Sequence, residues 1–214
     1  MNDKIKVILV DDHAVVRAGF RMLLAASESI VVIAEAERGE QAIHLAQEQS
    51  ADVIVMDLSM PGLGGLETIR RICQRDEQAK VLVFSVHDEM VYIDRAMAAG
   101  AKGYISKNSA PAMLPEAIEK VARGELFIEA GLVKERPGRA EISDYQTIIN
   151  AFSAREFDVF CLLAIGLTVH KVADELCLGY KTVANYGTQI RAKLNVSSLA
   201  KLAHIAVKLR VMEK

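Results

Sequence analysis

Residues 52–62 read DVIVMDLSMPG and join an apolar run to an acid and a turn. Its four apolar residues at 53–56 run straight into the carboxylate of Asp57, and a Pro-Gly turn signal follows. A short, unbroken apolar run bounded by turn residues is typical of a strand that is covered on both faces, as in a parallel sheet. The stretch therefore predicts a buried strand that ends in an acidic side chain.

Three further apolar runs also end in polar residues: IKVILV (5–10) precedes Asp11 and Asp12, KVLVFS (80–85) ends in Ser85, and KGYISK (102–107) ends in Lys107. The ligand crevice of an open parallel sheet lies outside the carboxyl ends of its strands, so these side chains are expected to share one pocket. Three carboxylates, a hydroxyl and an ammonium suit Mg²⁺, which prefers oxygen ligands, together with a phosphoryl group. Asp57 is then the expected nucleophile, while Lys107 and Ser85 are expected to contact phosphoryl oxygens.

The composition is that of a globular protein with one or two domains. The chain has 214 residues, of which 51% are hydrophobic and 25% are charged. No apolar stretch approaches the roughly 18 residues of a membrane helix, and the amino terminus lacks the layout of a signal peptide. The cysteines (Cys73, Cys161, Cys177) are odd in number and lack metal-ligand spacing, which fits free thiols in a reducing cytoplasm. We therefore expect a cytoplasmic protein.

Charge is distributed unevenly along the chain. Residues 1–123 carry 14 Lys and Arg against 18 Asp and Glu, a net charge of -4. Residues 124–149 carry 3 against 5, a net of -2, and residues 150–214 carry 9 against 5, a net of +4. An acidic front and a mildly basic tail indicate separate functions, and the tail is the part that could bind a polyanion such as DNA.

The hydrophobic pattern of residues 1–123 alternates between strands and helices. Strands are expected at about 5–10, 31–35, 52–57, 80–84 and 102–106, and helices at about 13–26, 39–49, 64–75, 88–99 and 110–122. Five such units joined by short connections predict an α/β doubly wound domain with a five-stranded parallel sheet.

A different regime begins at Gly124. Residues 124–149 contain ERPGRAE (135–141) and are expected to form a linker, within which 126–133 forms a short packed turn or helix. Ser153 and Glu156 have the spacing of a helix capping box. Four helices are expected from there on, at about 153–165, 168–176, 180–194 and 197–210, with a helix-turn-helix join between the second and third. The predicted domains are 1–123, a linker over 124–149, and 150–214.

The acidic pocket resembles the receiver domain of two-component response regulators, the CheY-like, flavodoxin-like fold. The resemblance rests on Asp11-Asp12, Asp57 with Met60-Pro61-Gly62, Ser85 and Lys107. It implies that Asp57 is the phosphoacceptor and that Mg²⁺ is bound by Asp11, Asp12, Asp57 and the backbone carbonyl of Ser59. It also implies that Ser85 and Tyr104 form a switch pair, and that Ser59 and His87 border the phosphoryl group and tune its lifetime.

A phosphohydrolase is an alternative interpretation of the acidic pocket. Phosphohydrolases of the haloacid dehalogenase type carry a second acid two residues after the nucleophile, and Ser59 occupies that position here. The stretch 62–65 (GLGG) is followed by Leu66-Glu67 rather than by Lys-Ser/Thr, so it is a poor phosphate loop. These departures favour a protein that is not an enzyme.

The third carboxyl-terminal helix has two distinct faces. Val183, Gly187, Ile190 and Leu194 form an apolar stripe, with polar and short residues opposite. The segment FSAREFDVFCLLAIGLTVHKVADELCLGYKTVANYGTQIRAKLNV (152–196) resembles the LuxR/FixJ (NarL) type of helix-turn-helix. This resemblance implies that the DNA-binding residues are Lys181 and Thr182 at phosphates, Ala184, Asn185 and Thr188 nearest the bases, Gln189 on the same face, and Arg191 and Lys193 beside them.

The combined prediction is a response regulator transcription factor. Its expected partners are a sensor histidine kinase, promoter DNA and a second copy of the chain when active, with no membrane association. Ala184, Tyr186 and Gly187 depart from the family's usual recognition helix. A phosphorelay or protein-interaction module with weak or no DNA binding therefore remains the alternative.

Overall fold

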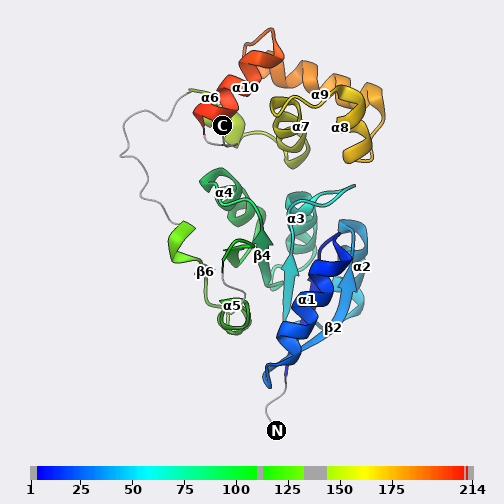
Figure 1. Cartoon of the computed structure of the whole chain (residues 1–214), viewed down its shortest axis with the longest axis vertical. Coiled ribbons are helices and arrows are strands. Elements are labelled where there is room, and N and C mark those ends of the chain that lie inside the picture. The colour runs from blue at the N-terminus through cyan, green and yellow to red at the C-terminus, as the bar shows by residue number, and fades with distance from the viewer. Residues whose placement is uncertain (1–3, 110–112, 133–143, 210, 212–214) are drawn as a thin grey trace. The chain divides into compact units, whose positions relative to one another are not determined.

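The structure is a computed structural model that describes residues 4–109, 113–132, 144–209 and 211 (Figure 1). The chain divides into two compact units, Met1–Val133 and Lys134–Lys214. No helix among the described residues is long and apolar enough to cross a membrane.

The first unit alternates strands and helices as the apolar runs predict. The strands are β1 (Ile5–Val10), β2 (Ile30–Ala36), β3 (Val53–Met56), β4 (Val81–Ser85), β5 (Gly103–Ser106) and β6 (Phe127–Ile128). The helices are α1 (Ala14–Ala25), α2 (Gly39–Glu48), α3 (Gly65–Arg75), α4 (Met90–Ala99) and α5 (Met113–Ala122). All strand pairs are parallel, in the order β2-β1-β3-β4-β5-β6, so the predicted doubly wound sheet is confirmed.

Helices cover both faces of this sheet (Figure 1). On one face, Val7, Leu9 and Phe84 pack into a core cluster with Leu24 of α1 and Ile118 of α5. The other face is covered by α2, α3 and α4, which contact one another in that order. Because side chains alternate along a strand, each central strand must be apolar on both sides, which explains the unbroken runs in the sequence.

The sheet has six strands, where the sequence predicted five. The extra strand β6 lies inside the predicted linker and pairs with β5, with Gly103 opposite Phe127 and Tyr104 opposite Ile128. A Cβ at Gly103 would lie 2.9 Å from the carbonyl oxygen of Phe127, so only glycine allows this close approach. A 3₁₀ turn, Ala130–Leu132, follows, in line with the short packed turn expected there. Residues 133–143 of the predicted linker lie outside the described residues.

The second unit is helical. Its helices are α6 (Asp144–Asn150), α7 (Ala154–Ala164), α8 (Val169–Glu175), α9 (Tyr180–Lys193) and α10 (Leu199–Lys208). The last four match the four predicted helices, whereas α6 falls in the predicted linker. The Ser153–Glu156 capping box is confirmed, because Ser153 Oγ accepts the Glu156 N–H and the Glu156 carboxylate accepts the Ser153 N–H.

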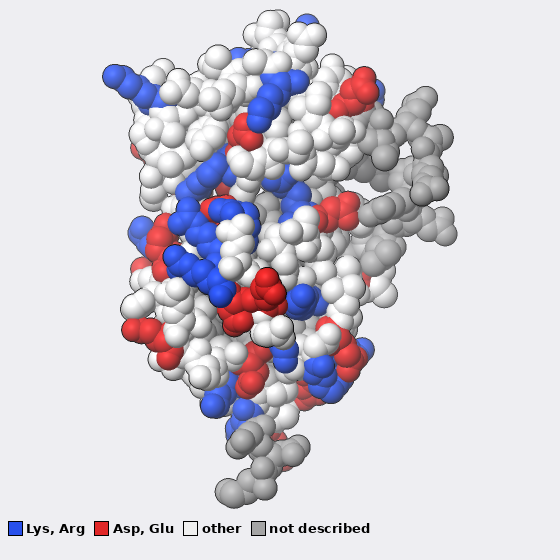
Figure 2. Space-filling view, turned by 180° about the vertical axis from the view of Figure 1, so that it is seen from behind, with Lys and Arg blue, Asp and Glu red and all other residues white. Residues whose placement is uncertain are grey.

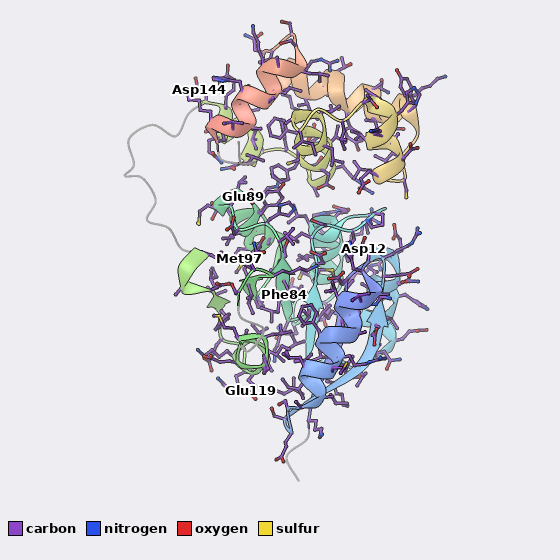
Figure 3. All side chains as sticks on the ribbon, viewed as in Figure 1. Asp12, Phe84, Glu89, Met97, Glu119 and Asp144 are labelled. Atoms are coloured by element: carbon purple, nitrogen blue, oxygen red, sulfur yellow. The ribbon has the colours of Figure 1, made fainter. Side chains whose placement is uncertain are left out.

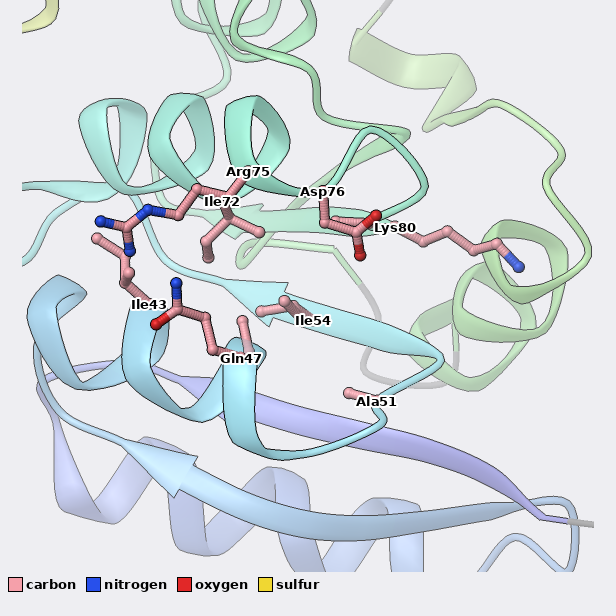
Figure 4. A pocket seen from close by; sticks show the side chains of 10 residues that line it. Ile43, Gln47, Ala51, Ile54, Ile72, Arg75, Asp76 and Lys80 are labelled. Carbon is pink, nitrogen blue, oxygen red and sulfur yellow. The ribbon is translucent and has the colours of Figure 1, made fainter.

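A small cavity of about 50 Å³ opens at the amino ends of β3 and β4, between α2 and α3 (Figure 4). It is lined by Ile43, Gln47, Ile54, Ile72 and Arg75, among others. Sites for small organic ligands usually occupy roughly 300–1,000 Å³, so we assign no ligand to this cavity. The acidic side chains predicted to form the functional site lie at the other edge of the sheet, at the carboxyl ends of the strands.

Candidate functional site

The carboxyl edge of the sheet brings Asp11, Asp12 and Asp57 together. Asp11 and Asp12 follow β1, and Asp57 follows β3, which is the neighbour of β1 in the sheet. One potential ligand atom from each of these residues, and from His13, lies within 4.8 Å of the others. Figure 3 shows Asp12 at this edge of the unit and Phe84 in its interior. Three carboxylates from two adjacent strands thus converge, as the sequence predicted.

Asp57 is the most deeply buried acid of the group, with 2% of its surface exposed. Its Oδ1 accepts the N–H of Leu58 at 2.7 Å, and its Oδ2 accepts a hydrogen bond from Lys107 Nζ at 2.7 Å. Burial raises the pKa of Asp57, and Lys107 acts in the opposite direction by favouring the charged form. The carboxylate is therefore poorly solvated but still has an ammonium beside it.

Lys107 joins two acids. It follows β5, and its Nζ also donates to Asp11 Oδ2 at 2.5 Å. Its backbone N–H donates to the carbonyl of Ser85 at 2.7 Å, which fixes the start of the β5–α5 loop beside β4. Burial by itself lowers the pKa of Lys107, but Asp57 and Asp11 outweigh burial and raise the pKa above its ordinary value. Lys107 is therefore a charged bridge across the pocket.

His13 is a further neighbour of the acids and lies outside the predicted set of site residues. Its ring Nδ1 lies 2.8 Å from Asp12 Oδ1 and 3.4 Å from Asp11 Oδ1. Its backbone N–H donates to Asp11 Oδ1 at 2.9 Å. Its position directly after two acids was an available signal. The donor set fits Mg²⁺, because carboxylate oxygens are the ligands this ion prefers.

Ser85 and Tyr104 lie on the adjacent strands β4 and β5, and both are fully buried. The Tyr104 ring points inward, and its hydroxyl donates to the carbonyl oxygen of His87 at 2.7 Å. Burial raises the pKa of Tyr104 far above its ordinary value, so the phenol stays protonated. His87 Nε2 lies 2.9 Å from Ser59 Oγ, and its ring stacks on Tyr92 with a centroid separation of 4.0 Å. Ser85, His87 and Ser59 lie at or just after the carboxyl ends of β4 and β3.

Gly65 explains why α3 can begin against the phosphoacceptor candidate. A Cβ at this position would lie 2.3 Å from the carbonyl oxygen of Asp57 and 2.5 Å from the Cα of Leu58. Those atoms are backbone and cannot move aside. The start of α3 therefore packs directly on the peptide that holds Asp57, and this contact requires glycine.

Helix α9 presents the two faces that the sequence predicted. Val183, Gly187, Ile190 and the following Leu194 are buried. Of the residues expected to bind DNA, Lys181, Thr182, Asn185, Thr188, Gln189 and Lys193 are exposed, and Ala184 and Arg191 are half-buried. Figure 2 shows acidic and basic side chains intermingled over the visible face of the protein. Most of the outer surface of α9 is therefore exposed, and its basic side chains are the exposed Lys181 and Lys193 and the half-buried Arg191.

Several of these α9 side chains already have partners. Thr188 Oγ1 donates to the carbonyl of Ala184 at 3.0 Å, and Arg191 Nη2 donates to Thr188 at 3.4 Å. Lys193 Nζ donates to Glu156 at 2.5 Å. These contacts could not be foreseen from a helical wheel, because they involve rotamers and a second helix.

An exposed aromatic pair adjoins the start of α9. The rings of Tyr180 and His170 of α8 have centroids 4.4 Å apart, and Tyr180 is 49% exposed. The sequence analysis included neither residue among the expected DNA contacts.

Two family descriptions match the chain. Residues 7–119 match the response regulator receiver domain, and residues 150–206 match the luxR family of bacterial regulatory proteins. Together the two matches cover the strand-end acids and the helix-turn-helix.

Relatives match the chain over almost its whole length. The chain is 38% identical to the transcriptional activator protein ExaE of Pseudomonas putida over 206 residues, which cover 94% of this chain and 95% of ExaE. It is 35% identical to the response regulator UvrY of Escherichia coli (strain K12) over 205 residues, which cover 95% and 94%. The structure of RcsB from Salmonella enterica serovar Typhimurium, bound to promoter rprA with the phosphomimetic BeF3⁻, matches with a TM-score of 0.65 and 25% identity, covering 95% of this chain and 98% of RcsB.

The parallel sheet and the receiver match therefore agree over the first unit, and the luxR-family match covers helices of the second. The relatives match almost the whole chain. The protein belongs to the response regulators that combine a receiver domain with a luxR-family DNA-binding domain and regulate transcription.

Proposed function

We propose that Asp57 accepts a phosphoryl group from a sensor histidine kinase and that this modification controls DNA binding by the second domain. The observation that carries the proposal is the buried bridge in which Lys107 joins Asp57 to Asp11. In the reaction, an oxygen of Asp57 forms a bond to phosphorus while the bond between phosphorus and the kinase's phosphohistidine nitrogen breaks. Desolvation of Asp57 favours this attack, because no water shell has to be removed from its carboxylate.

Mg²⁺ is the proposed cofactor. Asp11, Asp12, Asp57 and the backbone carbonyl of Ser59 would hold it, and its charge would offset that of the carboxylates and of the phosphoryl oxygens. The convergence of three carboxylates supports this ligand set. Replacing Asp12 by Ala is expected to weaken Mg²⁺ binding and slow phosphorylation. An unchanged Mg²⁺ titration would remove Asp12 from the site.

Lys107 and Ser85 are the proposed contacts of the bound phosphoryl group. Lys107 would turn from Asp57 to a phosphoryl oxygen, and the Ser85 hydroxyl would donate to another. Tyr104 points inward and its hydroxyl donates to the carbonyl of His87. A shift of Ser85 would therefore move Tyr104 and change the surface at α4. Ser59 and His87, hydrogen-bonded to each other, would govern access of water to the acyl phosphate.

The second domain is proposed to bind promoter DNA through α9. Lys181 and Thr182 would contact phosphates, and Ala184, Asn185, Thr188 and Gln189 would face the bases, with Arg191 beside them. Lys193 contributes less, since its ammonium already contacts Glu156. The promoter-bound RcsB structure supports this assignment by relationship. We further propose a cytoplasmic protein that is not an enzyme and forms a homodimer when active, with a receiver domain over 1–123 and a DNA-binding domain over 150–214.

The alternative is a phosphorelay or protein-interaction module with little DNA affinity. Ala184 and Thr188 favour it, because Ala184 has no polar group for a base and the Thr188 hydroxyl already donates to the Ala184 carbonyl. The transcription factor and the interaction module would both be phosphorylated at Asp57. They differ in whether the second domain binds DNA.

Phosphorylation is tested by treating the protein with acetyl phosphate and Mg²⁺ and measuring its intact mass. The wild type is expected to gain one phosphoryl group, and the Asp57→Asn variant none. Asp52→Asn is the matched control, because Asp52 precedes β3 and accepts the N–H of Lys6 at 2.7 Å near the opposite edge of the sheet. Equal labelling of the wild type and Asp57→Asn would refute the assignment.

A further inference from the structure

Glu129 ties the end of the receiver domain to the strand that precedes Lys107. It directly follows β6, and its backbone N–H donates to the carbonyl of Tyr104 at 3.1 Å. Phe127 makes the equivalent bond to the carbonyl of Lys102, also at 3.1 Å. The segment after α5 is therefore attached along β5.

The Glu129 side chain holds the loop that carries Lys107. Its Oε2 accepts the N–H of Ser106 at 3.0 Å, and its Oε1 accepts the hydroxyl of Ser109. These two serines lie on either side of Lys107 and Asn108 in the sequence. One carboxylate thus binds a residue on each side of Lys107 and, together with the bond from the Lys107 N–H to the Ser85 carbonyl, holds the Lys107 backbone in place.

We propose that Glu129 is a positioning residue for Lys107 and that it couples the phosphorylation pocket to the chain leading to the DNA-binding domain. The inference rests on the proposed function, in which Lys107 binds a phosphoryl oxygen. During the reaction the Lys107 ammonium must move from Asp57 to that phosphoryl oxygen. A fixed loop keeps the Lys107 backbone in place while the side chain moves.

Coupling follows from the position of Glu129 in the chain. Residues 130–132 form a turn directly after it, and residues 133–143 then lead to α6. A change in the loop on phosphorylation would alter the hydrogen bonds of Glu129 and hence the attachment of this segment. By thermodynamic reciprocity, DNA binding that alters the segment would also change the pocket.

The positioning role is tested by replacing Glu129 with Ala in the full-length protein, in both wild-type and Lys107→Ala backgrounds. The rate of phosphorylation at saturating acetyl phosphate is expected to fall roughly 10- to 100-fold in the wild-type background, as when the group that orients a reacting side chain is lost. In the Lys107→Ala background no further fall is expected, because Glu129 acts through Lys107. A fall of the same size in both backgrounds, or none in either, would overturn the proposal.

Two conservative variants keep the test decisive if Glu129→Ala does not fold. Glu129→Gln retains one acceptor oxygen, and Ser109→Ala removes one of the two donors, so each is expected to give a smaller fall in rate. Wild-type rates in both would overturn the proposal. Glu125→Ala is the control, because the Glu125 carboxylate pairs with Arg123 at the surface, and the rate of this variant is expected to be unchanged.

The coupling role is tested on fully phosphorylated protein, verified by intact mass. Retention of genomic DNA fragments in a gel shift is expected to rise less on phosphorylation in Glu129→Ala than in the wild type. An equal rise would overturn the coupling. Failure of the wild type to be labelled by acetyl phosphate would instead reject the proposed function itself.

Discussion

Replacing Lys107 by Met is expected to destabilise the receiver domain strongly, and to do so in a pH-dependent manner. The substitution keeps a long side chain but removes the charge shared by Asp11 and Asp57. The Lys107 side chain is 13% exposed, and those of Asp11 and Asp57 are 7% and 2% exposed, so water cannot replace the ammonium well. Removing one partner of a buried ion pair costs about 3–5 kcal/mol.

The lower end of that range applies here. Each carboxylate keeps a backbone hydrogen bond, Asp57 from Leu58 and Asp11 from His13, which offsets part of the loss. We therefore expect a loss of about 3 kcal/mol in the free energy of unfolding at about pH 8. Lys102→Met is the matched control, because Lys102 is exposed just before β5, and its effect should stay within about 0.5 kcal/mol.

The sign of the pH dependence follows from linkage. The pKa of Lys107 is raised in the folded protein, so its contribution is complete below its unfolded pKa of about 10.4 and is lost only as the pH rises through the folded value. Burial already raises the pKa of Asp57, and removing Lys107 raises it further. The folded variant then takes up a proton that the unfolded chain does not, so the deficit of the variant should shrink as the pH falls toward about 5.

The assay is urea unfolding followed by far-ultraviolet circular dichroism, with separate transitions for the two domains. Added Mg²⁺ should restore more stability to the variant than to the wild type, because the cation replaces the missing charge. A loss below about 1 kcal/mol, or one that is equal at about pH 8 and about pH 5, would show that the ion pairs of Lys107 do not stabilise the domain as described.

Three further predictions concern packing and DNA recognition. Gly65→Ala should destabilise the receiver domain by about 2 kcal/mol or more in the same assay, because the new methyl group meets backbone atoms. Lys193→Met should cost the second domain about 1 kcal/mol, since Lys193 is half exposed and its pairing is screened. Burial alone raises the pKa of Glu156, but Lys193 and Ser153 hold it below its ordinary value, so this loss should appear above about pH 4.5 and fade in acid. In gel shifts, Lys181→Ala should weaken binding to all DNA sequences alike, whereas Asn185→Ala should relax discrimination at one base pair; two variants indistinguishable from the wild type would exclude α9 as the reader.

The sequence predicted the fold where burial dictates the residue pattern. The runs that became β1, β3, β4 and β5 are apolar on both faces because helices cover both sides of the sheet. Strand β6 has only two residues and depends on close approach to Gly103, so no periodicity could reveal it. Helix α6, DYQTIIN, is too short to carry a clear helical pattern and falls within the predicted linker.

The same distinction holds for the candidate site. The acids at the strand ends could be predicted to meet because topology brings the carboxyl ends of parallel strands together. The bridge from Lys107 to Asp11 and the contact between Lys193 and Glu156 depend on side-chain conformations and on residues far apart in sequence. The contacts of Glu129 could not be predicted, because they depend on the unexpected strand β6.

A gel shift against genomic fragments measures whether phosphorylation of the protein controls its DNA binding. The wild type and Asp57→Asn are each compared with and without acetyl phosphate and Mg²⁺. The phosphodonor is expected to increase retention of specific fragments by the wild type and to have no effect on Asp57→Asn. Retention by the wild type that is absent, or the same with and without the phosphodonor while intact mass shows full labelling, would contradict the proposed function.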